Sequence, residues 1–139
     1  MNSTLVALTD EECWRLLTLN DLGRIAIVRD GAPEIFPLSY RVVQDGDVRS
    51  ILIRTRVDNA IDRAGASVCF QIDGVDPGGH SGWSVMASGH LHTAARPLDT
   101  TRVAPDGHDT WRKVVVRRVS GRRLDDAPSL WAFNPAGYL

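Results

Sequence analysis

The sequence has very little lysine and cysteine, and it contains no long apolar run. No stretch approaches the roughly 20 apolar residues that a membrane-spanning helix needs, so we expect a soluble protein. The N-terminus lacks the basic start and apolar core of a secretory signal, which makes the cytoplasm the expected location. Cys13 and Cys69 form no C-x-x-C pair, so we expect two small buried thiols in a reducing compartment.

The charges nearly cancel, with 16 basic and 17 acidic residues and a formal net charge of −1. This balance argues against binding to nucleic acid or to an anionic membrane. Six basic residues crowd together near the C-terminus. Such a cluster is typical of a solvated strand edge whose basic side chains pair with aspartates. A sharper interpretation is that Arg122 or Arg123 reaches across a subunit interface toward a phosphate or an acidic substrate group. The cluster consists of Arg112, Lys113, Arg117, Arg118, Arg122 and Arg123.

The length of 139 residues favours a single domain, 1–139, with residues 1–8 as an arm and 125–139 as a tail. A chain of this size buries about two-thirds of its unfolded surface in one core. A second domain is therefore not expected.

Local patterns predict one helix followed by six strands. Thr9-Asp10-Glu11-Glu12 has the form of a capping box and predicts a helix that ends near Asn20. Asp30-Gly31 and Gln44-Asp45-Gly46-Asp47 are hairpin signals. The strands are expected at residues 22–29, 34–43, 48–55, 67–73, 83–95 and 111–119.

Two of these strands are irregular. Pro37 removes a ladder donor, which predicts an edge, a bulge or a bend. In the last strand, strict alternation places Val116 and Val119 on opposite faces, so neither face is purely apolar. Six strands with short turns favour a mainly β fold, an antiparallel barrel that hides its edges. The mixed last strand predicts that a second subunit covers part of the wall.

Residues 51–64 predict a buried strand that runs directly into a short helix. Ile51-Leu52-Ile53 suits the strand, and Asp58 or Asn59 can cap the helix. A helix N-terminus offers free N–H groups and partial positive charge, and Arg54, Thr55 and Arg56 lie just before it. The junction is the best candidate in the chain for a phosphate seat. The alternative is an ordinary strand end with solvated arginines.

The remaining polar groups point to no catalytic machinery. His90 and His92 share one strand face, but they have no acidic or thiol partner at a short fixed spacing, so an ordinary polar strand face is favoured over a metal site. The sequence contains no G-x-S-x-G, G-x-G-x-x-G or Walker motif. Tyr40 and His90 are candidate proton donors by residue type alone.

With this order of elements, the chain resembles the pyridoxamine 5′-phosphate oxidase-like family, the flavin-binding split barrels. No single motif carries the resemblance, which depends on the order and spacing of several segments. These are Thr9 to Cys13, Leu22 to Ala26, Glu34 to Tyr40, Arg54-Thr55, Gly82 to Val85, Gly121 to Leu124, and the tail Trp131-Ala132-Phe133.

The resemblance implies a six-stranded split β-barrel with an N-terminal helix and a short helix after the third strand. It implies a homodimer with two FMN sites at the subunit interface. Pro37 to Tyr40 would lie along the isoalloxazine ring, the Arg54-Thr55 segment and the helix start would hold the phosphate, and Trp83 would lie near the cofactor. The expected cofactor-binding residues are Pro37, Leu38, Ser39, Tyr40, Arg54, Thr55, Arg56, Asn59, Trp83 and Arg122.

One departure from the family pattern keeps alternatives open. Many members place a lysine, or an Arg-Lys pair, at the helix start, whereas Asn59-Ala60-Ile61 supplies no cation. The first hypothesis is an FMN-dependent oxidoreductase acting on a small organic substrate. The alternatives are a deazaflavin-dependent reductase, a non-enzymatic module that binds a flavin or another planar ligand, and a site that has lost its cofactor. Pyridoxamine phosphate oxidase activity itself is not expected, because the chain is short for that enzyme and its substrate-phosphate residues have no clear match.

Overall fold

The computed structural model describes residues 4–56, 65–75, 81–97 and 109–125. Within these ranges the chain forms one helix and seven strands. In chain order they are β1 (Thr4–Ala7), α1 (Asp10–Leu19), β2 (Leu22–Arg29), β3 (Ala32–Asp45), β4 (Val48–Arg56), β5 (Ser67–Val75), β6 (Gly82–Thr93) and β7 (Asp109–Asp125). The short helix expected after the third strand, with its cap at Asp58 or Asn59, lies outside the described residues.

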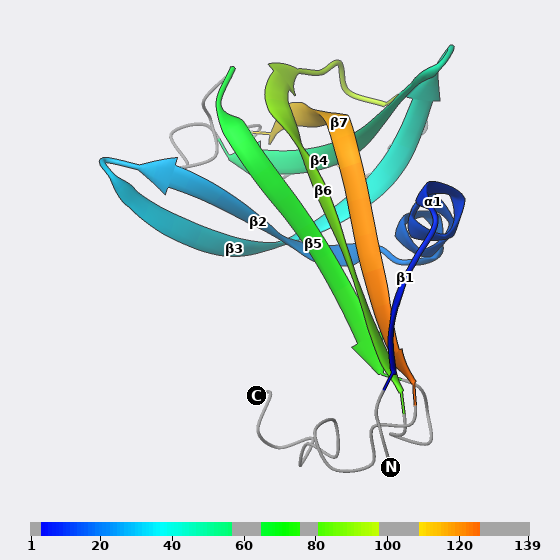
Figure 1. Cartoon of the computed structure of the whole chain (residues 1–139). Coiled ribbons are helices and arrows are strands. Elements are labelled where there is room, and N and C mark those ends of the chain that lie inside the picture. Colours follow the sequence, from blue (N-terminus) through cyan, green and yellow to red (C-terminus); the bar gives the residue numbers. More distant parts are fainter. Residues whose placement is uncertain (1–3, 57–64, 76–80, 98–108, 126–139) are drawn as a thin grey trace.

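All seven strands belong to one antiparallel sheet that closes on itself. The order β7-β4-β3-β2-β5-β6 is completed by pairing between β6 and β7, which makes a ring of six strands (Figure 1). These are the six strands predicted from the sequence. The seventh, β1, pairs Thr4 to Ala7 with the last residues of β7. Four residues of the segment expected to be an arm, 1–8, thus form a strand along the edge of β7.

Both predicted hairpin turns are confirmed. Asp30 and Gly31 have φ values of 52° and 80°, the positive pair that a type I′ turn requires. Gly46 has a φ of 61° at the first position of the second turn, between Asp45 and Val48. Glycine and aspartate tolerate these conformations, so the two turns fix the registers of β2 with β3 and of β3 with β4.

Helix α1 begins with the predicted capping box. The side chain of Thr9 accepts a hydrogen bond from the Glu12 N–H at 3.2 Å, and the Glu12 carboxylate accepts one from the Thr9 N–H at 2.8 Å. The helix buries Cys13 and Leu17. A Cβ added at Gly121 would lie 2.8 Å from the Cys13 Sγ, so the glycine allows α1 to pack closely on β7.

The core fills the ring with side chains from most of the strands. The run Ile51-Leu52-Ile53 is buried throughout, as the sequence predicted. Phe70 is completely buried, and its ring would contact a Cβ at Gly23 at 2.4 Å, which explains why β2 carries a glycine there. The largest fully buried side chains are Phe70, Leu17, Ile25, Ile51, Ile53, Ile72 and Leu91.

The alternation predicted for the last strand was wrong beyond Val116. The pairing of β6 with β7 shifts between Ser88 and Gly89, so that Ser88 lies opposite Arg118 while Gly89 lies opposite Val116. Arg117 is the extra residue of this bulge, and it is exposed. The extra residue moves each later side chain of β7 to the face opposite the one expected from strict alternation. Val116 and Val119 therefore both pack against the core. The inner side of β7 is consequently more apolar than the sequence suggested.

Within the described residues, no helix is both long and apolar enough to span a membrane.

Candidate functional site

The barrel opens between β3 and β4. Pairing between these strands begins at Asp45 and Val48 and ends at Tyr40 and Ile53. Beyond that point, residues 32–39 of β3 pair with β2, whereas Arg54 to Arg56 of β4 pair with β7. Figure 1 shows the β2–β3 hairpin projecting away from β4. We call this opening, between Pro37–Ser39 and Arg54–Arg56, the split. Its two sides are the two segments that the sequence assigned to the cofactor.

Pro37 lies on an edge of the split and not in a bulge. The β2–β3 register runs without a shift from Leu22 opposite Ser39 to Arg29 opposite Ala32, with Pro37 opposite Arg24. Pro37 and Ser39 are exposed, and Leu38 is half-buried. Of the three options predicted for Pro37, the edge is the one observed. A missing N–H causes least loss on an edge, since no neighbouring strand there requires it.

Tyr40 closes the inner end of the split. Its hydroxyl donates to the Leu17 carbonyl at 2.7 Å, and its ring packs edge-on against Phe70 with centroids 4.7 Å apart. Burial, with the negative charge of Asp21 as a second cause, raises the pKa of Tyr40 to about 12. The suggestion that Tyr40 donates a proton to a substrate does not fit this arrangement, because its hydroxyl is buried and already bonded to α1.

On β4, alternation separates the predicted anion-binding residues. Arg54 is exposed, whereas Thr55 is buried with only 5% of its surface accessible. Because successive strand residues point to opposite faces, the Arg54 side chain lies on the outside of the barrel and that of Thr55 on the inside. A ligand held by Arg54 therefore lies on the outer face. The side chain of Arg56 and all of Asn59 lie outside the described residues.

Trp111 is a group that sequence reasoning did not place in the site. It lies directly opposite Arg54 in the β4–β7 register, and hence on the same face. The indole Nε1 is buried and has no hydrogen-bond partner within the described part of the chain. The Trp111 carbonyl accepts from the Ala94 N–H at 3.2 Å and from Arg112 Nη1 at 3.0 Å. The backbone is thus fixed while the side-chain donor remains unused.

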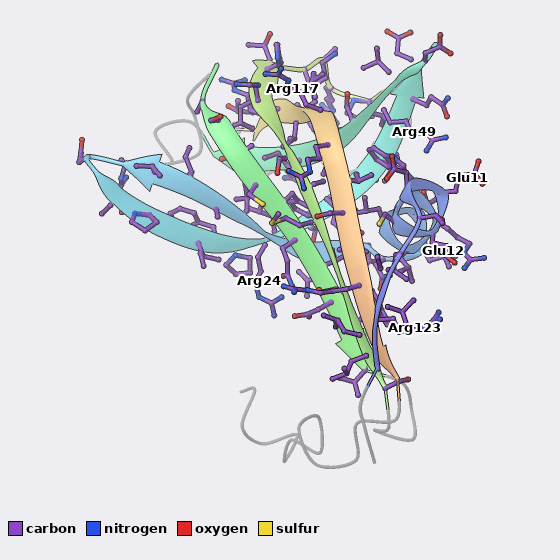
Figure 2. The ribbon with its side chains drawn as sticks, in the orientation of Figure 1. Glu11, Glu12, Arg24, Arg49, Arg117 and Arg123 are labelled. Atoms are coloured by element: carbon purple, nitrogen blue, oxygen red, sulfur yellow. The ribbon has the colours of Figure 1, made fainter. Side chains whose placement is uncertain are left out.

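A polar network borders the other side of the split. Arg24 Nη1 lies 3.5 Å from an Asp73 carboxylate oxygen and donates to the Gln71 side-chain oxygen at 3.3 Å. The Gln71 amide in turn donates to Asp73 at 3.1 Å. Figure 2 shows Arg24 on the surface of the sheet where β2 and β5 run together. A hollow of about 140 Å³ beside the network is lined by Leu22, Gly23, Arg24, Pro37 and Asp73.

Trp83 and Arg122 do not lie at the split of their own chain. Trp83 pairs with Arg123, and Arg122 pairs with Ser84, at the far end of β7 from Trp111. Arg122 follows Trp111 by eleven positions, a path along the strand of roughly 35 Å. Arg117, in the middle of β7, and Arg123, near its end, are labelled in Figure 2 and already lie well apart. One chain therefore does not bring all the predicted residues together.

Arg122 faces a second, larger hollow. It has a volume of about 370 Å³ and is lined by Gln71, Ser84, Val85, Met86, Ser120, Gly121 and Arg122. Trp83, in contrast, is half-buried, and its indole covers Gly74, where an added Cβ would lie 2.6 Å from the ring. His90 is half-buried, and its Nε2 lies 3.5 Å from the Ser67 hydroxyl. Within the described ranges, no three histidine, cysteine or acidic side chains gather as metal ligands do.

Comparison with known proteins identifies the family. The family model described as pyridoxamine 5′-phosphate oxidase matches residues 9–133, most of the chain. The chain belongs to the pyridoxamine 5′-phosphate oxidase family. This confirms the resemblance inferred from the sequence, and the partly closed ring of antiparallel strands is the expected split barrel.

Individual relatives agree with this assignment. An FAD-binding protein of Mycobacterium smegmatis is 29% identical, with a TM-score of 0.68, over 86% of this chain and 98% of that one. An FAD-binding protein of Mesorhizobium loti is 22% identical, with a TM-score of 0.70, over 89% of this chain and 99% of that one, and this likeness concerns the fold. An uncharacterised protein of Mycobacterium tuberculosis is 30% identical over 101 residues, which span 70% of this chain and 66% of the relative.

Proposed function

We propose that this protein is a flavin-dependent oxidoreductase that acts on a small organic substrate, with its cofactor at a homodimer interface. The observation that carries the proposal is the split. There, the two segments expected to hold the isoalloxazine ring and the phosphate separate from one another at a single point, Tyr40 opposite Ile53.

The residues at the split fit a flavin nucleotide. Pro37 and Ser39 present an exposed strand edge along which a flat ring can lie. Arg54 supplies a guanidinium on the outer face, and the buried Trp111 N–H supplies a donor without an acceptor among the described residues. Phosphate oxygens only accept hydrogen bonds, so this donor set suits them.

A bound flavin supplies hydride or electron transfer, and the protein supplies orientation and electrostatics. Pro37 to Ser39 would set the position of the ring, and Arg54 would neutralise charge on the phosphate. Tyr40 would hold the inner end of the split in place through its bond to Leu17. No side chain at the split needs to act as a general acid or base, because the donors there bind the ligand.

The cofactor proposed from the sequence is FMN. Two solved structures of similar fold are described as FAD-binding proteins, which supports FAD. FMN and FAD share the isoalloxazine ring, the ribityl chain and the first phosphate, so the split suits both. Mass spectrometry of the cofactor released from the purified protein would distinguish them from each other and from a deazaflavin.

The homodimer is supported by exposed apolar side chains on the outer face of β2, β3 and β6. Leu22, Val28 and Ile35 have 63%, 60% and 66% of their surface exposed, and Met86 has 43%. Large apolar side chains exposed on one face are typical of a protein–protein interface. The partner would also bring its own Arg122 toward the split, since one chain holds the two regions far apart.

The decisive experiment combines absorption and reduction. The purified protein, reconstituted with FMN or FAD, should show flavin bands that bleach when a nicotinamide donor is added without oxygen. Reoxidation by a small organic acceptor would identify the substrate class. Protein that binds no flavin would contradict the proposal.

A second function, flavin binding without catalysis, is favoured by one observation. The expected helix start, Asn59-Ala60-Ile61, carries no cation for the phosphate. In that case the protein would bind flavin, but neither a nicotinamide nor another physiological donor would reduce the bound flavin faster than it reduces free flavin.

A further inference from the structure

The buried indole N–H of Trp111 has no acceptor within the described residues. A buried donor without an acceptor is rare in folded proteins, because it loses its bond to water and gains nothing in return. Such a group calls for an explanation, and a bound ligand is one. The indole nitrogen only donates, so the missing group must be an acceptor.

The position of Trp111 indicates which acceptor this is. Trp111 and Arg54 are direct partners across β7 and β4, and their Cβ atoms are about 5 Å apart on the same face. Thr55, on the opposite face, points into the core. A cationic donor and a neutral donor therefore lie side by side on the outer face, where β4 separates from β3.

The main chain of Trp111 is held on both sides. The Trp111 carbonyl accepts two hydrogen bonds, from Ala94 and from the Arg112 side chain. Neighbouring strands hold the residue on both sides, through Arg54 on β4 and through Ala94, just after β6. The main chain that carries the indole donor therefore loses little conformational entropy when an acceptor binds.

We propose that Trp111 Nε1 donates a hydrogen bond to a phosphate oxygen of the flavin nucleotide, beside the Arg54 guanidinium. This inference rests on the proposed function. It also accounts for the missing cation at Asn59-Ala60-Ile61, because a buried neutral donor on β7 supplies a contact that the expected helix start lacks.

The test is Trp111→Phe, which keeps an aromatic ring and removes only the donor and the larger ring volume. Affinities for FMN and for riboflavin, which has no phosphate, are measured by flavin fluorescence on the apoprotein. FMN affinity should fall roughly tenfold, the loss of one hydrogen bond to a charged acceptor, while riboflavin affinity stays within twofold. Trp14→Phe is the matched control, since Trp14 stacks under Arg49 with the guanidinium carbon 5.3 Å from the ring centroid, away from the split.

A second readout separates a ligand contact from a structural one. The melting temperature of the Trp111→Phe apoprotein should equal or exceed that of the parent, because the substitution removes an unsatisfied donor. The rise in melting temperature caused by saturating FMN should be smaller in the variant than in the parent.

Four outcomes would overturn the inference. Equal losses for FMN and riboflavin would place the N–H against the ring or the ribityl chain. Unchanged FMN affinity with a less stable apoprotein would mean that a protein acceptor, such as a carbonyl of a second subunit, satisfies the donor. A parent protein that binds neither ligand would refute the proposed function as well, whereas a parent that binds both with no effect of the variant would refute this inference alone.

Discussion

The hydroxyl of Tyr40 donates a hydrogen bond to the carbonyl of Leu17 at 2.7 Å and so ties β3 to the last turns of α1. Tyr40 and Ile53 also form the pair between β3 and β4 that lies farthest from their hairpin turn. Its main-chain N–H is bonded as well, to the Asp21 carbonyl at 2.9 Å. The point at which the two strands separate is therefore fixed by three contacts of one residue.

Tyr40→Phe should lower the free energy of unfolding by about 1–2 kcal/mol, because the Leu17 carbonyl loses its buried donor. Chemical denaturation at neutral pH would measure the loss. Flavin affinity should change little, since the ring and its contact with Phe70 remain. A loss of flavin binding with unchanged stability would instead assign the hydroxyl to the ligand.

The raised pKa of Tyr40 predicts a loss of stability in alkali. The folded-state value is about 12, and an unfolded tyrosine titrates near 10, so the folded protein retains a proton that the unfolded chain releases. This contribution is complete below pH 10 and declines as the pH rises toward 12. Burial also raises the pKa of both cysteine thiols, which adds a decline of the same sign above about pH 9.

Denaturation curves between pH 8 and pH 11.5 would show this decline. Tyr40→Phe should make it shallower, and the thiol contribution should remain. A variant that loses stability as steeply as the parent would show that Tyr40 is not responsible.

Arg54→Ala should weaken flavin binding by roughly 2–3 kcal/mol, about thirty- to more than a hundredfold, because it removes a charged donor from the phosphate. The fold should survive, as Arg54 is exposed. Arg49→Ala is the matched control on the same strand, since Arg49 lies beside α1 in Figure 2 and stacks on Trp14.

Affinity should be measured at two ionic strengths, and the difference between parent and Arg54→Ala should shrink in high salt. Equal losses in the two arginine variants would mean that general surface charge, and not the split, attracts the ligand.

Pro37→Val should reduce ligand affinity more than it reduces stability. The proline is exposed on the edge of the split, so the free energy of unfolding should change by about 0.5 kcal/mol or less. The new N–H alters the edge that faces the flavin ring. A lower melting temperature with unchanged flavin affinity would show that Pro37 serves the fold only.

The protein should sediment as a dimer at low micromolar concentration. Ile35→Glu should convert it to a monomer without unfolding it, because Ile35 is 66% exposed on the proposed interface. Val48→Glu, at a position 49% exposed beside the second hairpin turn, is the control and should remain dimeric. A compact monomer of the parent protein would refute the two-chain cofactor site.

Sequence reasoning found both sides of the split but misjudged or missed several of its neighbours. Pro37 and Arg54 belong to segments with a recognisable local pattern. Sequence reasoning gave Trp111 no part in the site, since nothing in a single strand reveals which residue lies opposite it. Arg24 lay within a segment that carried the family resemblance, yet its network with Gln71 and Asp73 depends on the pairing of β2 with β5.

The sequence by itself determined the features that depend on near neighbours in the chain. The capping box of α1, the turns at Asp30-Gly31 and Gly46, and the burial of Ile51 to Ile53 are decided by short-range hydrogen bonds, backbone conformation and hydrophobicity. The tertiary structure alone decided the bulge at Arg117, the pairing of β1 with β7, and the position of Trp111 beside Arg54. These depend on which strands meet and in what register, and a shift of one residue moves every later side chain to the opposite face.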